Sequence, residues 1–146
     1  MKEIYGNLLE IKEGIICHQV NCQGVMGAGI ALQIKKKWSQ VFEDYLCAYR
    51  QQITKKNLLG TVVITQVTPE LKVASIFGQD YYGASGWTDY IALHKAAIYL
   101  KENYPDTPIY IPYHMGCGLA KGDWSSVLDA LSLLDEHLTI VRLVSF

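Results

Sequence analysis

The segment NCQGVMGAGIALQIKKKW, residues 21–38, joins a glycine-rich stretch directly to an apolar and then basic helical pattern. Its glycines, Gly24, Gly27 and Gly29, precede the predicted helix rather than interrupt it. The apolar run GIICHQV at 14–20 stands immediately before the segment and predicts a buried strand. A strand, a glycine loop and a helix in this order are typical of α/β folds in which a ligand approaches the backbone closely. The segment therefore predicts an α/β fold with a binding loop.

Strand and helix patterns alternate along the rest of the chain, and no repeat or linker interrupts them. We expect strands over residues 2–5, 14–20, 61–67, 71–77, 108–113 and 138–146. We expect helices over residues 28–37, 40–49, 89–103 and 124–136. Ser39, Thr88 and Asp123 are the predicted N-caps of the last three helices. This alternation favours one domain spanning residues 1–146, a three-layer α/β/α sandwich around a central mixed sheet.

Composition limits the class of protein. The chain has 146 residues, enough for one sizeable core, and its 13 Lys and Arg nearly balance its 14 Asp and Glu. This balance gives no basic excess for binding nucleic acid, and no apolar run is long enough to span a membrane. The start of the sequence lacks the pattern of a signal peptide, so we expect a cytoplasmic protein. We also expect a monomer.

Cysteine and histidine spacing gives no sign of a metal site. The four cysteines, Cys17, Cys22, Cys47 and Cys117, form no CxxC pair, and the histidines lack HxxxH spacing. We therefore expect reduced thiols, no metal and no cofactor. Cys117 stands in a second glycine cluster, where both a small space-filling residue and a nucleophile remain possible.

The second glycine cluster, HMGCGLAKGDW at residues 114–124, follows the predicted strand 108–113. Carboxyl ends of parallel strands meet at one edge of a sheet, so the two glycine loops are expected to face each other. Backbone N–H groups at helix starts bind anions, and such a pair of loops suits a diphosphate. Neither GxxxxGK[ST] nor GxGxxG is present. The alternative is that the glycines only form tight turns.

Three segments in this order, HQVNCQGVMGAGIALQIKKKW, SIFGQDYYG and IPYHMGCGLAKGDW, resemble macrodomains. The MGAGIA and GCGLA forms are similar to the branch of ADP-ribose-1''-phosphate phosphatases and terminal ADP-ribose glycohydrolases. The resemblance implies a fold that binds ADP-ribose, or a 1''-substituted derivative, in a cleft. Nucleic acid or protein would then be a partner only as an ADP-ribosylated substrate, in de-ADP-ribosylation.

The resemblance also implies which residues contact the ligand, chiefly through the backbone of the two loops. These residues are Asn7, Leu8, Asn21, Met26, Gly27, Ala28, Gly29, Ile30, Gln79, Met115, Gly116, Cys117, Gly118, Leu119 and Ala120. Asn7 would face the adenine, and Asn21 the distal ribose. The alternatives are a turn-forming role for Asn7 and a loop-stabilising role for Asn21.

Two positions depart from the glycohydrolase pattern. Gln79 stands where those proteins carry a lysine that attacks the distal ribose, and Ala120 where they carry an aspartate. Glutamine cannot form a Schiff base, so both departures argue against the lysine-dependent mechanism. Tyr81 and Tyr82 are expected either over the distal ribose or in the core.

His18 and Asp123 are the predicted catalytic residues. The resemblance to the phosphatases places a histidine before the Asn-Cys pair, and a carboxylate after the second loop, towards the distal ribose. The alternatives are a buried core histidine and a helix N-cap. We therefore expect a metal-independent hydrolase, with ADP-ribose-1''-phosphate the leading substrate. A non-catalytic ADP-ribose reader and an eraser of ADP-ribose from protein or nucleic acid remain alternatives.

Overall fold

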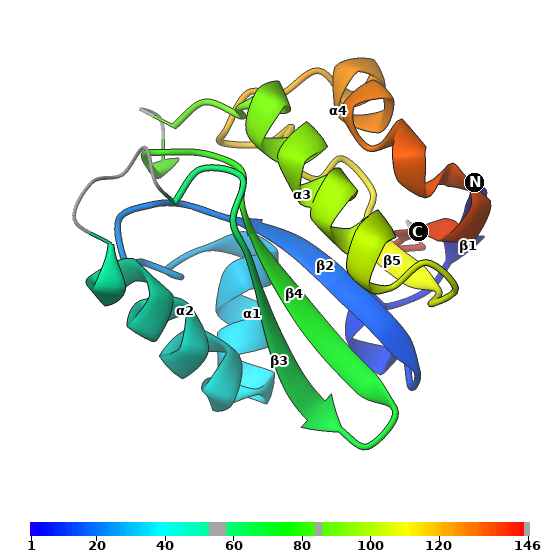
Figure 1. Ribbon diagram of the computed structural model, residues 1–146, viewed down its shortest axis with the longest axis horizontal. Helices are drawn as coiled ribbons and strands as arrows, with labels where there is room; N and C mark the ends of the chain where they lie inside the picture. The colour runs from blue at the N-terminus through cyan, green and yellow to red at the C-terminus, as the bar shows by residue number, and fades with distance from the viewer. Residues whose placement is uncertain (53–57, 84–85, 145–146) are drawn as a thin grey trace.

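A computed structural model describes residues 1–52, 58–83 and 86–144 of the chain (Figure 1). A six-stranded sheet in the order β1-β6-β5-β2-β4-β3 forms its centre. The strands are β1 (Lys2–Tyr5), β2 (Gly14–Val20), β3 (Val62–Thr68), β4 (Leu71–Phe77), β5 (Ile109–Pro112) and β6 (Leu138–Arg142). Neighbouring strands run parallel except β3, which runs antiparallel to β4, so the sheet is mixed as predicted.

Helices cover both faces of this sheet (Figure 1). One face carries α1 (Gly29–Lys37) and α2 (Ser39–Gln51), and the other carries α3 (Tyr90–Asn103) and α4 (Trp124–Ala130). Two 3₁₀ turns, η1 (Leu8–Glu10) and η4 (Ser132–His137), precede β2 and β6. The predicted three-layer α/β/α sandwich is confirmed. None of the described helices is long and apolar enough to cross a bilayer.

Strand β2 is buried on both faces. Ile15 and Cys17 join the apolar cluster beneath α3 and α4, whereas Ile16 and Val20 join the cluster beneath α1 and α2. A central strand that packs against two layers of helices is buried on both faces, which is why residues 14–20 are mostly apolar in the sequence. The bounds of β2 and β4 agree with the prediction.

Two of the three predicted N-caps are wrong. Helix α1 ends at Lys37, so Trp38 is the one residue between the two helices. Trp38 is therefore the N-cap of α2, and Ser39 is the first residue of that helix. Asp89, not Thr88, caps α3: its Oδ1 accepts the N–H of Ala92 at 2.9 Å. The hydroxyl of Thr88 is instead engaged by the second glycine loop. Asp123 is confirmed as the cap of α4.

The predicted helix over 124–136 and the predicted final strand are both shorter in the structure. Helix α4 ends at Ala130, and Leu131, whose backbone leaves the helical conformation, starts the 3₁₀ turn η4. Strand β6 ends at Arg142, after which Leu143 and Val144 are exposed. Residues 145–146 of the predicted strand lie outside the described part of the chain.

His18 lies inside the core rather than at the surface. It faces Ser75 across the β2–β4 pair, with its Nε2 2.8 Å from the Ser75 Oγ, and both residues are fully buried. Its Nδ1 has no hydrogen-bond partner among the residues that the structure describes. Burial lowers the pKa of His18 from 6.5 to about 3, so the imidazole is neutral in the folded protein. This placement matches the alternative of a core histidine.

Neutral His18 makes the free energy of unfolding depend on pH. The unfolded chain takes up a proton on this residue near its usual pKa of about 6.5, and the folded chain does not. Stability contributed by His18 is therefore complete above about pH 6.5 and is lost as the pH falls towards about 3. Between pH 7 and 5, denaturant unfolding of the wild type should lose about 2 kcal/mol more than that of His18→Gln.

The remaining titratable groups are the same in both proteins, so the difference between their pH profiles isolates His18. Parallel profiles would mean that the pKa of His18 is the same in the folded and the unfolded chain.

Candidate ligand-binding site

The first glycine loop is held from beneath by Tyr45 of α2. The buried Tyr45 hydroxyl lies 2.7 Å from both carbonyl oxygens of Asn21, backbone and side chain. The same oxygen accepts the backbone N–H groups of Gly24 and Val25 at 3.0 and 3.1 Å. Burial raises the pKa of Tyr45 above its usual value, so the group stays a neutral hydroxyl. One side chain from another helix thus sets the start of the loop.

Asn21 is committed to the loop itself. Its Oδ1 accepts the N–H of Gln23 at 3.0 Å, and its Nδ2 donates to the carbonyl oxygen of Val25 at 2.8 Å. The residue is only 8% exposed. These contacts match the loop-stabilising alternative for Asn21, and the predicted ribose contact stays a prediction.

The middle of the first loop presents bare backbone to solvent. Gly27, Ala28 and Gly29 are exposed, Ile30 is half-buried, and Met26 anchors the loop in the core. Gly29 has a φ of +57°, in the left-handed region that favours glycine. Ala28, the N-cap of α1, offers no side-chain acceptor, so the first turn of α1 lacks a side-chain cap. Uncapped N–H groups with the helix dipole behind them attract an anion.

The second glycine loop, residues 113–123, closes on itself through the carbonyl oxygen of Gly116. That oxygen accepts the N–H of Gly122 at 2.7 Å, and the N–H of Lys121 donates to Gly118 at 3.0 Å. Gly118 and Leu119 are exposed at the outside of the turn. Met115 and Ala120 are buried beneath it, so these two predicted contacts reach a ligand only through the backbone.

Cys117 lies within this loop, near enough to Asp123 at its end to be affected by the carboxylate. Burial raises the pKa of the Cys117 thiol, and the nearby Asp123 carboxylate raises it further. A neutral thiol favours the space-filling role over the nucleophile. Asp123 is exposed, and its Oδ2 accepts the N–H and the hydroxyl of Ser126 at 3.1 and 2.8 Å.

Gln79 follows β4 and points inward. Its Oε1 accepts from Gln19 and its Nε2 donates to the carbonyl oxygen of Tyr81, both at 2.7 Å. Tyr81 and Tyr82 are 47% and 50% exposed and stack on each other, so the alternative of two core tyrosines is wrong. The aromatic pair lies at the surface beyond β4.

Asn7 caps the 3₁₀ turn η1 at the end of β1. Its Oδ1 accepts the N–H of Leu9 at 2.9 Å, and the adjacent Leu8 is buried. This geometry matches the turn-forming alternative. A carbonyl oxygen has two lone pairs, however, so the exposed Asn7 retains capacity to accept a second bond.

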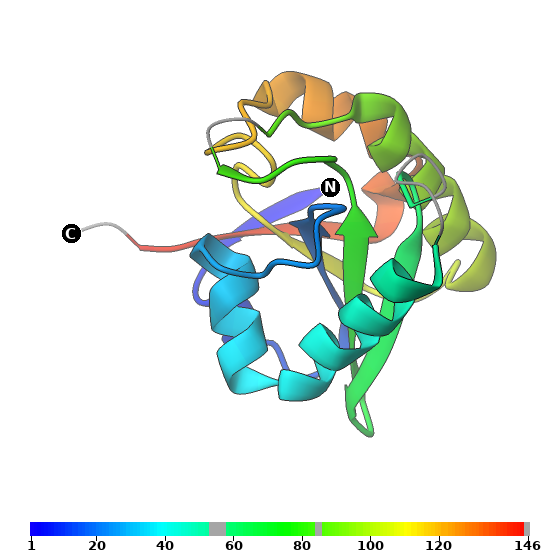
Figure 2. The ribbon, with the colours of Figure 1, turned by 90° about the vertical axis from the view of Figure 1, so that its left-hand side faces the viewer.

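Strand order brings the predicted residues to one edge of the sheet. The neighbouring strands β5, β2 and β4 run parallel, and their carboxyl ends lead into the second loop, the first loop and Gln79. Figures 1 and 2 show the segments after β2 and β4 gathered at the end of the sheet opposite the β3–β4 hairpin. Asn7 leaves the same edge from the outer strand β1, with β6 between it and β5. Of the two predicted catalytic residues, His18 is enclosed in the core, whereas Asp123 is exposed.

Sequence reasoning missed Gln19, which contacts the segments on both sides of β2. In the sequence Gln19 is one residue of a predicted buried strand. The only signal for a special role was a polar side chain among mostly apolar residues. No group of three or more potential metal ligands occurs within residues 1–52, 58–83 and 86–144.

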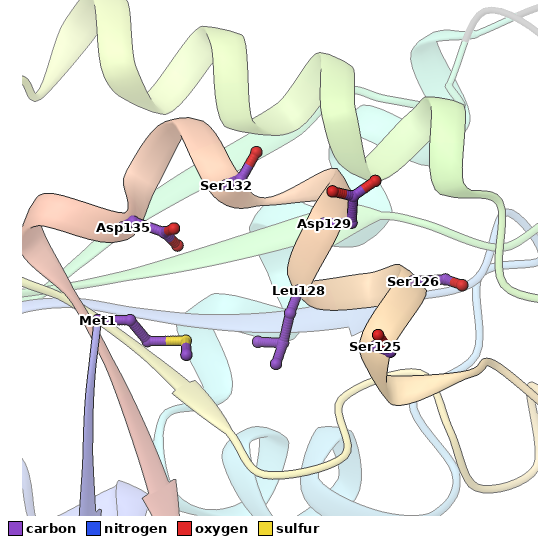
Figure 3. Close-up of a pocket in the computed structure, with 7 residues that line it drawn as sticks. All are labelled: Met1, Ser125, Ser126, Leu128, Asp129, Ser132 and Asp135. Atoms are coloured by element: carbon purple, nitrogen blue, oxygen red, sulfur yellow. The ribbon is translucent and has the colours of Figure 1, made fainter.

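An open depression of about 410 Å³ lies beside α4 and η4, and none of its lining residues belongs to the two glycine loops (Figure 3). Figure 3 shows the side chains of Met1 and Leu128 pointing into it from the start of β1 and from α4. Its other lining residues are Ser125, Ser126, Asp129, Ser132 and Asp135. None of the predicted site residues lines it, so its size alone does not make it the functional site.

Comparison with known proteins identifies the fold. No protein-family model and no curated protein matches the sequence. A solved structure of a protein of unknown function from Bacteroides thetaiotaomicron has a TM-score of 0.78 and 28% identity, covering 98% of this chain and 97% of that chain. A macrodomain protein from Streptomyces coelicolor has a TM-score of 0.76 and 22% identity, over 99% of both chains.

Thermosipho africanus DarTG, solved in complex with ADP-ribose, has a TM-score of 0.76 and 16% identity. That match covers 98% of this chain and 42% of the longer chain. These similarities extend over nearly the whole sequence and include the central sheet and both layers of helices. The chain therefore has the macrodomain fold.

Proposed function

We propose that this protein binds ADP-ribose, with the diphosphate lying between the first and second glycine loops. The observation that carries the proposal is the exposed backbone of Gly27–Gly29 leading into the uncapped N-terminus of α1. Such a turn offers N–H donors and a favourable dipole to a doubly charged group without requiring a basic side chain. The ADP-ribose in the Thermosipho africanus DarTG structure supports the same choice of ligand.

The placement of polar side chains supports a direction for the ligand. Asn7 stands at the end of β1 and Gln79 at the end of β4, which are four strand spacings apart in the sheet. At about 4.8 Å per spacing this is about 19 Å, the scale of an extended nucleotide-sugar. The adenine is proposed near Asn7, and the distal ribose near Gln79, Tyr81 and Tyr82.

Hydrolysis of an ADP-ribose derivative is the second candidate function, and the exposed carboxylate of Asp123 favours it. Asp123 ends the second loop with an exposed carboxylate, and in this proposal that carboxylate activates water or holds a proton without a metal. Loop N–H groups would stabilise the charge that develops on the departing group. ADP-ribose-1''-phosphate remains the leading substrate, since Gln79 and Ala120 lack the groups of the lysine-dependent glycohydrolases. Buried His18 takes no part in this version of the mechanism.

Calorimetry should detect binding of ADP-ribose with a dissociation constant of about 1–100 µM, and much weaker binding of AMP. The reason is that both loops are proposed to bind the diphosphate, and AMP has only one phosphate. Ribose-5-phosphate is the matching control for the other half of the ligand. Equal affinities for AMP and ADP-ribose would remove the two-loop site.

Gly29→Glu should weaken ADP-ribose binding at least tenfold, because it places an anion where the diphosphate is proposed. A Cβ at this position meets no atom within 4 Å, so the variant should fold. Gly29→Ala is the matched control, since it shares the backbone strain at a φ of +57°, about 1–2 kcal/mol, without the charge. Loss of affinity in both variants alike would assign the effect to strain.

Asp123→Asn separates catalysis from capping. Asparagine caps a helix as well as aspartate does, so the melting temperature should hold, while turnover should fall about 100-fold or more. Asp123→Ala should in addition lose about 1 kcal/mol of stability. Turnover is measured on ADP-ribose-1''-phosphate, O-acetyl-ADP-ribose, and mono-ADP-ribosylated protein and DNA.

Undiminished turnover in Asp123→Asn would exclude the carboxylate from the chemistry. A wild type that binds ADP-ribose but turns over none of these substrates would be a non-catalytic reader. Turnover of only the modified protein or DNA would instead identify an eraser.

A further inference from the structure

Gln19 carries a buried side chain that reaches both segments flanking β2. The residue is 9% exposed, and its Nε2 donates to the Oε1 of Gln79 at 2.7 Å and to the Oγ1 of Thr88 at 3.0 Å. The Thr88 hydroxyl in turn donates to the carbonyl oxygen of Gly116 at 2.6 Å. Both hydrogen-bond partners of Gln19 therefore lie between β4 and α3, and Thr88 extends the connection to the second glycine loop.

The hydrogen bonds around Gln19 determine which way its side-chain amide is oriented. Gln79 donates through its own Nε2 to Tyr81, so its Oε1 must be the atom that faces Gln19. Thr88 has one hydroxyl proton, and because that proton goes to Gly116, the Thr88 oxygen accepts from Gln19. Both neighbours thus require the NH₂ group of Gln19 on their side.

The carbonyl end of Gln19 fills space that two glycines leave open. Its Oε1 lies 2.7 Å from where a Cβ would stand on Gly78, and 2.8 Å from where a Cβ would stand on Gly116. This oxygen has no hydrogen-bond partner among the described residues, although the side chain is nine-tenths buried. Burying an unpaired carbonyl is unfavourable, so the contacts on the NH₂ side must offset it. The Gln19 side chain is packed tightly against both segments.

Backbone contacts show what the amide holds in place. The N–H of Thr88 donates to the carbonyl oxygen of Ala120 at 2.8 Å, and the Gly116 oxygen that receives the Thr88 proton also accepts the N–H of Gly122. The exposed turn at Gly118 and Leu119 lies between these two points of attachment. Its position relative to β2 therefore depends on the bonds that start at Gln19.

We propose that Gln19 is a positioning residue: its buried amide holds Gln79 and Thr88 against β2, Thr88 in turn holds the second glycine loop, and ADP-ribose affinity depends on this. The dependence of affinity rests on the proposed function, whereas the positioning of the loop does not. Gln19 touches no ligand in this scheme and acts only through Thr88, Gln79 and Gly116.

Amide hydrogen exchange by NMR in the Gln19→Met variant tests the proposal, since methionine keeps the length of the side chain and removes both donors. Exchange at Thr88 and Gly122 should accelerate about tenfold or more, and ADP-ribose affinity should fall by a similar factor. The N–H of Ile15, bonded to Pro108 at 2.9 Å in the core, is the internal reference and should not change. Gln66→Met is the matched control, because Gln66 also donates through its Nε2, in its case to the carbonyl oxygen of Thr68, but lies at the β3–β4 hairpin.

A second variant displaces the amide without altering position 19. A Cβ in Gly78→Ala would lie within 2.7–2.9 Å of three Gln19 side-chain atoms, which are the three nearest atoms to it. The variant should reproduce the faster exchange at Thr88 and Gly122. If Gln19→Met also exchanges rapidly at Ile15, which would indicate a general loss of stability, Gly78→Ala becomes the test of the positioning role.

The outcomes separate the two proposals. Unchanged exchange at Thr88 and Gly122 in a folded Gln19→Met protein overturns the positioning role. Accelerated exchange with unaltered ADP-ribose affinity overturns the dependence of binding on Gln19. A wild type that binds no ADP-ribose contradicts the proposed function, and the exchange measurement still decides the role of Gln19.

Discussion

Burial of β2 on both faces is the constraint on which the rest of this structure depends. Because Ile15 and Cys17 face one apolar cluster and Ile16 and Val20 the other, β2 must lie between two layers of helices and between two partner strands. Both partners, β5 and β4, run parallel to it. Three chain segments therefore leave the sheet side by side at one edge, and this arrangement creates a surface to which loops distant in sequence contribute.

The glycines at this edge have two different physical roles, which the sequence does not distinguish. Gly27 and Gly29 are exposed, and they leave backbone accessible from solvent. Gly78 and Gly116 instead make room for the Gln19 side chain inside the protein. The prediction that glycines indicate close approach holds at Gly116, where the approaching group is the Gln19 side chain, whereas the approach of a ligand to Gly27 and Gly29 stays a prediction.

Much of the fold could be predicted from the sequence because periodicity reports burial. Strands β2 and β4 are mostly apolar and were predicted with their observed bounds. Helix caps were harder to predict, since Thr88 and Asp89 are both good capping residues, and the choice between them depends on Gly116, which is far away in sequence. The role of Gln19 was invisible for the same reason.

Part of the candidate site could likewise be predicted from the sequence, and part could not. The two loops follow from local patterns, and the strand order brings them to one edge. The position of His18 was open in the sequence, because a strand residue that precedes a loop can point inward or outward. In the structure His18 lies opposite Ser75 on the neighbouring strand, and both side chains are buried in the core. The carboxylate of Asp123 serves as a cap and still remains exposed, so the two interpretations of that residue are compatible.

The Tyr45 hydroxyl has a thermodynamic consequence for recognition. Its bonds to Asn21, Gly24 and Val25 order the start of the first loop in the protein itself. The conformational entropy of that segment is therefore lost on folding rather than on association with a ligand. In the proposed complex, a preorganised loop of this kind would contact the diphosphate at little further entropic cost. Association would then be governed mainly by desolvation of the diphosphate and of the backbone N–H groups that replace its water.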